Sequence, residues 1–112
     1  MPKLLVHLED GLRRTYDPTT IAHLEAVDGN TVLHRRRGRP LTDVRTLGQL
    51  LPAFQRHGFL RIHREHAIHP EAVYEIRRRT RHDWELKLIP PLNTILPIAR
   101  TRLKTLWRAF GE

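Results

Sequence analysis

The sequence contains no cysteine, few aromatic residues and no long apolar run. The absence of cysteine excludes disulfide bonds, thiolate metal sites and cysteine nucleophiles, and it suits a reducing cytosol. Aromatic residues make up only 6% of the chain, so the stacking platforms typical of single-strand RNA binders are missing. No apolar run approaches the roughly 20 residues that span a bilayer, and no secretory signal is recognisable. We therefore expect a cytoplasmic chain without membrane contact.

Signatures of catalysis are missing as well. The sequence offers no paired-carboxylate site, no Gly-rich phosphate loop and no nucleophile elbow. We therefore expect neither an enzyme nor a bound cofactor.

What the chain does have is positive charge. It carries 20 Lys plus Arg against 12 Asp plus Glu, a formal net charge of +8, and 17 of the 20 basic residues are Arg. Arg presents a planar fork of donors that suits phosphates and guanine edges, so the composition favours nucleic-acid binding. The alternative is a G+C-rich genome whose codons favour Arg at solvated positions. The length of 112 residues and the 39% hydrophobic content fit one globular domain over 1–112.

Short strands separated by turn residues account for most of the sequence. We expect strands over 4–8, 12–16, 21–27, 31–35, 41–44, 59–63, 72–76, 84–88 and 94–98. Asp10-Gly11 and Asp28-Gly29 predict two hairpin turns. A short helix should begin after Thr46, with Gln49 as its capping-box partner, and apolar residues at helical spacing predict a second helix in 99–110. The fold class is therefore all-β with two short helices.

Three blocks of sequence carry a family resemblance. They are Ile21-Ala22-His23-Leu24-Glu25-Ala26 with Asp28-Gly29-Asn30, then Thr46-Leu47 and Leu50-Leu51 ahead of Phe59-Leu60-Arg61-Ile62-His63-Arg64, and finally Leu96-Pro97-Ile98-Ala99-Arg100. At these positions the chain resembles the LytTR (LytR/AlgR-type) DNA-binding domain of bacterial transcription regulators. The resemblance extends over residues 4–110.

The resemblance implies an elongated stack of small, mainly antiparallel β-sheets, whose loops enter successive major grooves of double-stranded DNA. Family members commonly sit behind a phospho-receiver domain and bind paired direct-repeat sites. The chain would then be a nucleoid-associated, sequence-specific transcription regulator that pairs with a second copy on DNA. It is either a stand-alone member or a fragment of a regulator with a further receiver or sensor domain.

Two arginines match the family's DNA-contact positions. Arg100 matches the late Arg that reaches base edges, and Arg64 matches the contact position after the strand ending at His63. An Arg fork can pair with guanine O6 and N7 together. His63 either donates to a phosphate or packs beneath Arg64. The alternative for both arginines is a solvated surface charge.

Four further residues are candidate DNA contacts. Asn30 and Thr31 are expected at the tip of a DNA-facing hairpin, where Asn can pair with adenine and Thr can touch a thymine methyl or a phosphate. Plain turn chemistry is the alternative for Asn30. Arg102 and Lys104 are candidates for the phosphate backbone, with a solvated helix face as the alternative. The Arg runs at 35–37 and 77–79 are interpreted as solvated turns, and Trp84 and Trp107 as core.

Several positions depart from the family pattern and keep other functions open. Glu65 and Ala99 replace two serines of the family, and either change favours a protein–protein interaction module that keeps the fold without specific DNA binding. A metal site is the other alternative, because His63, His66 and His69 lie close in sequence. Their spacing is poor for a metal, since an extended chain would send residues 63 and 66 to opposite faces. No metal site is expected.

Overall fold

The fold is known from a computed structural model that describes residues 3–112. Its ten strands are β1 (Leu4–His7), β2 (Arg13–Tyr16), β3 (Ile21–Val27), β4 (Asn30–Arg35), β5 (Leu41–Asp43), β6 (Leu60–His63), β7 (His66–Ile68), β8 (Val73–Arg78), β9 (Trp84–Leu88) and β10 (Ile95–Ile98). The helices are α1 (Leu47–Gln55) and α2 (Leu103–Ala109), with 3-10 turns η1 (Glu9–Gly11), η2 (Pro18–Thr20), η3 (Pro70–Ala72) and η4 (Arg100–Arg102).

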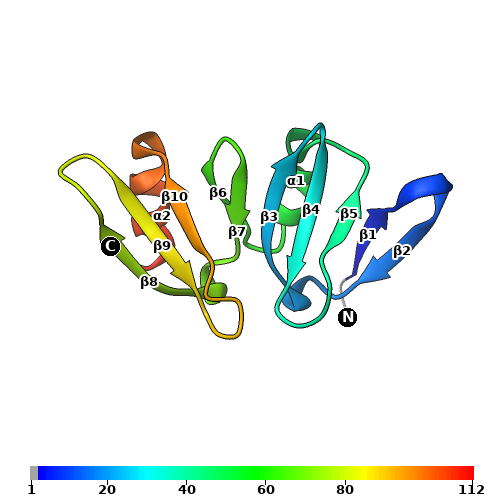
Figure 1. Cartoon of the computed structure of the whole chain (residues 1–112), viewed down its shortest axis with the longest axis horizontal. Coiled ribbons are helices and arrows are strands. Elements are labelled where there is room, and N and C mark those ends of the chain that lie inside the picture. The colour runs from blue at the N-terminus through cyan, green and yellow to red at the C-terminus, as the bar shows by residue number, and fades with distance from the viewer. Residues whose placement is uncertain (1–2) are drawn as a thin grey trace.

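The strands form three antiparallel sheets arranged along an elongated molecule of 45 × 29 × 24 Å (Figure 1). The orders are β1-β2, then β5-β4-β3-β7-β6, then β10-β9-β8. In Figure 1 the five-stranded sheet lies between the other two. The prediction of an all-β fold in small sheets with two helices is confirmed. No helix in residues 3–112 is long and apolar enough to cross a membrane.

Local sequence explains the turns and the first helix. Asp28 and Gly29 adopt φ of 50° and 81° between β3 and β4, the left-handed backbone that a tight hairpin requires. The side chain of Thr46 accepts from the amide of Gln49, and the side chain of Gln49 accepts from the amide of Thr46, so the predicted capping box is confirmed. The helix runs through Pro52 to Gln55, longer than the short turn expected, because its apolar stripe packs into the core.

Two hydrophobic clusters flank the central sheet. The first joins β1, β3, β4 and α1 and contains Leu4, Val6, Ile21, Leu24, Leu33, Leu47, Leu50, Leu51, Phe54, Phe59 and Ala67. The second joins the central sheet to the C-terminal sheet and α2 through Ala22, Ile62, Ile68, Ala72, Leu86, Leu88, Leu96, Ile98 and Leu106. Each fully buried Leu or Ile stabilises the fold by roughly 1.5–3 kcal/mol, so both ends are fixed to the central sheet.

The histidine-rich segment 63–69 differs from the sequence prediction. Residues 66–68 form an additional strand, and β6 and β7 make a tight hairpin in which His63 pairs with His66. The expectation that an extended chain sends residues 63 and 66 to opposite faces is therefore wrong, because the chain reverses between them. Trp84 and Trp107 are half-buried and meet edge to face at 5.3 Å beside the second cluster.

Candidate nucleic-acid interface

Three connections lie along one long edge of the molecule, the upper edge in Figure 1. They are the β3–β4 turn, the β6–β7 turn and the C-terminal end of β10 with η4. Asn30 begins β4 directly after the first turn, Arg64 lies within the second, and Arg100 begins η4. The fold thus brings these three predicted residues, which come from distant parts of the sequence, to one edge. We call it the upper edge.

The β6–β7 turn is held by side chains from β6. Arg61 donates from Nε to the carbonyl of His63 at 3.3 Å and from Nη2 to the carbonyl of Arg64. His63 Nδ1 accepts from the amide of Glu65 at 3.1 Å, and the carbonyl of Glu65 accepts from the amide of Ala26 on β3 at 2.9 Å. These bonds fix the backbone of the turn and leave the Arg64 side chain exposed.

Arg61 is a residue that the sequence interpretation missed. Its guanidinium donates hydrogen bonds to the carbonyls of both His63 and Arg64, although the sequence interpretation singled out only those two residues. The available signal was its position two residues before His63 in a predicted strand, which places both side chains on one face. Within residues 3–112 no ion pair joins Arg64 to Glu65.

The end of β10 is coupled to β6. The amide of Ala99 donates to the carbonyl of Ile62 at 2.8 Å, so Arg100 is fixed relative to the β6–β7 turn. A groove of about 640 Å³ lies beside Arg100. Its lining includes His63, Arg79, His82, Asp83, Trp84 and Arg100. Arg79, the last residue of a run interpreted as a solvated turn, therefore shares a groove with two of the predicted contacts.

The loop between β8 and β9, which supplies Arg79 and His82, is itself ordered. The hydroxyl of Thr80 donates to Asp83 at 2.8 Å and accepts from the amides of His82 and Asp83. The other arginines of the run lie in β8, where Arg77 pairs with Glu85 at 3.0 Å. The two candidates for phosphate contact, Arg102 in η4 and Lys104 in α2, are exposed. They follow Arg100 closely along the chain.

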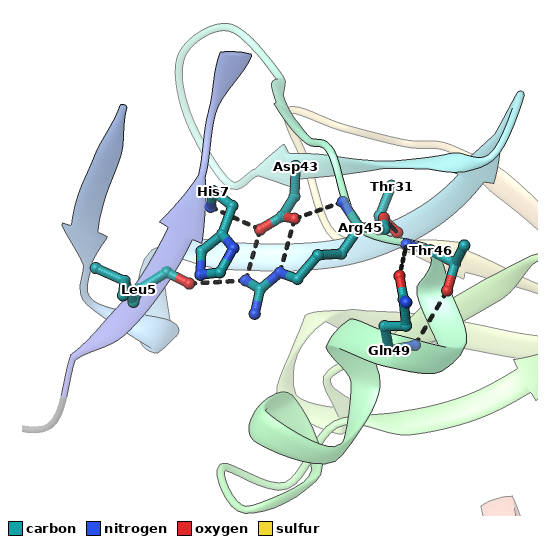
Figure 2. A network of polar contacts seen from close by, with 7 residues as sticks. All are labelled: Leu5, His7, Thr31, Asp43, Arg45, Thr46 and Gln49. Carbon is teal, nitrogen blue, oxygen red and sulfur yellow. Dashed lines mark hydrogen bonds and ion pairs between the residues drawn. The ribbon is translucent and has the colours of Figure 1, made fainter. Parts of the chain in front are cut away.

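The expectation that Thr31 is exposed at the hairpin tip is wrong. Thr31 is fully buried, and its hydroxyl donates to the carbonyl of Arg45 at 2.9 Å (Figure 2). It is the second residue of β4 and pairs with both Ala26 on β3 and Asp43 on β5. A position enclosed by two strands offers no surface to DNA, so Thr31 supports the hairpin from inside.

Behind Thr31 lies an ion pair between fully buried Asp43 and half-buried Arg45, which ties the N-terminal hairpin to the central sheet (Figure 2). Asp43 accepts from the amide of His7 at 2.9 Å and from Arg45 Nη2 at 2.8 Å, and Arg45 Nη2 also donates to the carbonyl of Leu5 at 3.0 Å. Burial raises the pKa of Asp43, but its hydrogen bonds and the Arg45 charge outweigh burial and lower that pKa. The carboxylate therefore stays ionised.

Beneath the β6–β7 turn lies a cluster of histidines. His23 is 2% exposed, stacks on His34 at 4.7 Å, and shares a hydrogen bond of 3.0 Å between its Nε2 and Nδ1 of His66. His34 Nε2 lies 2.9 Å from Glu25 Oε1. Burial, followed by the charges of His34 and His66, lowers the pKa of His23 to about 3. Burial also lowers the pKa of His66.

These contacts bear on the metal alternative. His69, grouped with His63 and His66 in the sequence, instead bonds the carbonyl of His57 through Nε2 at 3.0 Å. Among residues 3–112 no group of three or more His, Cys, Asp or Glu side chains has an arrangement that could hold a metal ion.

Comparison with known proteins agrees with the architecture. The LytTr DNA-binding domain family matches residues 13–111, nearly the whole length. The chain therefore belongs to the LytTR DNA-binding domain family. This membership supports DNA binding and a general role in transcription regulation, and the family is defined by DNA binding, not by catalysis.

One solved structure is similar to this chain. It is the LytTr DNA-binding domain of a response regulator from Bacillus cereus, with a TM-score of 0.78 and 16% sequence identity over 98% of this chain and 97% of that chain. At this identity the likeness shows the fold. Curated proteins include no match to this chain.

Proposed function

We propose that the upper edge reads duplex DNA in a sequence-specific manner, with Asn30, Arg64 and Arg100 entering the major groove. One observation carries the proposal: the β3–β4 turn, the β6–β7 turn and the C-terminal end of β10 with η4 lie along one edge. The molecule is 45 Å long and one turn of B-DNA rises about 34 Å, so this long edge can lie along a full helical turn. The family membership supports the same assignment.

The three side chains would have different partners. Arg64 and Arg100 are exposed and suit guanine O6 and N7, while the amide of Asn30 suits adenine N6 and N7. Arg102 and Lys104 would contact phosphate, as would Arg79, which lines the groove beside Arg100. His63 would act through the turn, because its Nδ1 already accepts from the amide of Glu65.

The domain would work as part of a bacterial transcription regulator that binds paired direct repeats. Two copies would then occupy the same face of the duplex, at half-sites a whole number of helical turns apart and far enough apart for two domains that are each 45 Å long. A receiver or sensor domain on a longer chain would control when they bind. The net charge of +8 would add sequence-independent affinity that falls as salt rises.

Binding-site selection from a random duplex library, at moderate salt, tests this proposal. We expect a compact motif, repeated at a spacing of a whole number of helical turns. Arg64→Ala and Arg100→Ala should each relax the preference at one base position, whereas Arg56→Ala, which removes an exposed charge after α1, should leave the motif unchanged. A bound pool with no enriched motif would contradict the proposal and favour a protein–protein interaction module on the same fold.

A further inference from the structure

The long edge opposite the proposed DNA-reading edge carries its own concentration of positive charge. Four of the five residues in 35–39 are Arg, and they lie at the end of β4 and in the β4–β5 loop, at the lower edge in Figure 1. Between this loop and η2 lies a groove of about 470 Å³. It is lined by Thr15, Tyr16, Asp17, Thr19, Thr20, Arg35, Arg36 and Arg37. Its size is that of a small-ligand pocket, which typically measures roughly 300–1,000 Å³.

Two of these guanidinium groups are held in place by the backbone. Arg36 donates from Nε to the carbonyl of Thr19 at 2.7 Å, and Arg35 donates from Nε to the carbonyl of Arg39 at 2.8 Å. Each bond uses one donor and leaves the two terminal nitrogens of the fork for another partner. Within the described residues neither arginine forms an ion pair. Glu71 shares a smaller cavity with Arg36 and is likewise not paired with it.

Gly38 explains how Arg35 reaches its position. Its φ of +93° turns the loop, and a Cβ at residue 38 would lie 3.1 Å from Nη2 of Arg35. The missing side chain thus makes room for the guanidinium, which packs over the turn. Because the fork is positioned before any ligand arrives, little side-chain entropy would be lost on binding.

The charge balance of the groove points to a doubly charged anion. The three arginines that line it face one carboxylate, Asp17, which accepts from the amide and the hydroxyl of Thr19 at 2.9 and 2.8 Å. Those bonds lower the pKa of Asp17, so it stays ionised. Three positive charges and one negative charge leave a surplus of two, which matches a phosphate monoester near neutral pH.

We propose that this groove binds the phosphate group of a small phosphorylated molecule, with Arg35, Arg36 and Arg37 as its ligands. The site is separate from the upper edge, so its occupancy and DNA binding need not compete. The proposal does not depend on sequence-specific reading of DNA.

Titration of the full chain with pyrophosphate at constant ionic strength, followed by amide NMR shifts, tests the site. We expect saturable shifts confined to the β4–β5 loop and η2. Arg36→Gln should weaken pyrophosphate binding about tenfold, the loss expected for one charge-assisted fork. Arg36→Lys should weaken it as well, because Lys keeps the charge without the fork. Arg108→Gln, which removes an exposed charge from α2, is the matched control and should bind as the unmodified chain does.

Several results would overturn the proposal. One is equal weakening by Arg36→Gln and Arg108→Gln, and another is full retention of binding by Arg36→Lys, since either would mean that net charge alone attracts the anion. If a random duplex, but not pyrophosphate, shifts the amide signals of the loop, this edge would instead bind a second DNA segment. Motif selection with Arg36→Gln separates the two proposals, because the enriched motif should be unchanged whatever happens to pyrophosphate.

Discussion

Acidification should destabilise this domain well before its carboxylates titrate, because His23 is buried in its neutral form. The pKa of His23 is about 3 in the folded chain, and the ordinary value of 6.5 applies in the unfolded chain. Between these values the unfolded chain binds a proton that the folded chain does not, so stability is fully present above pH 6.5 and is lost as pH falls below it. The slope is about 1.4 kcal/mol per pH unit, and the loss from pH 7 to pH 5 is about 2 kcal/mol.

Other groups can be separated from this effect. The pKa values of His66 and His7 are lowered too, so they contribute in the same direction. Asp17 and Asp43 also have lowered pKa values, but their ordinary value of 3.8 confines their contribution to more acidic solutions. The window between pH 7 and pH 5 therefore reports histidines.

Urea unfolding followed by Trp fluorescence at pH 7 and pH 5 measures the loss directly. The matched variant is His23→Gln, which can keep a hydrogen bond to His66 but does not titrate. The free energy of unfolding of the unmodified chain should fall by about 2 kcal/mol more than that of the variant between the two pH values. If the two chains lose the same amount, His23 is not buried as a neutral group and the reasoning fails.

Three further perturbations test the supports of the fold and of the upper edge. Asp43→Ala should lower the free energy of unfolding by about 3 kcal/mol in urea titrations, because it leaves Arg45 without its buried partner; a change below about 1 kcal/mol would contradict the ion pair. Thr46→Ala should cost about 1 kcal/mol in the same assay, while an unchanged midpoint would show that the cap is dispensable. Arg61→Ala should weaken binding to the selected DNA motif about tenfold more than it weakens binding to a random duplex, at about 0.7 kcal/mol for each of its two hydrogen bonds, because the lost charge affects both duplexes and the lost turn geometry affects only the motif.

Sequence reasoning identified the elements whose signals are local. Asp-Gly pairs, a capping box and period-2 alternation each depend on a few neighbouring residues, and the corresponding hairpins, helix start and strands are confirmed. It missed the strand at 66–68, because three residues give no periodicity and the hairpin at Arg64-Glu65 contains no Gly, Pro, Asn or Asp. That one omission also produced the wrong faces for His63 and His66.

The candidate site was harder to predict, since its members depend on contacts between distant segments. Thr31 directly follows the Asp28-Gly29-Asn30 turn in the sequence, and only its pairing with strands on both sides buries it. Arg61 resembles any other surface arginine until the hairpin places two carbonyls within its reach. The His23–His66 bond joins residues 43 positions apart, which no local pattern reveals.

The polar networks lie where the upper edge needs support. The Asp43–Arg45 pair fixes the backbone at Arg45, whose carbonyl accepts the hydrogen bond from the hydroxyl of Thr31, the neighbour of Asn30. Arg61 fixes the turn that carries Arg64. The amide of Ala99 bonds the same strand, β6, and so carries this order to Arg100. Packing alone does not fix the position of an exposed side chain on a short strand. Hydrogen bonds from neighbouring side chains to the backbone carbonyls beside it do fix that position. The spacing between Asn30, Arg64 and Arg100 is therefore set by the fold before the protein binds DNA, which predicts a low tolerance for inserted base pairs within a half-site.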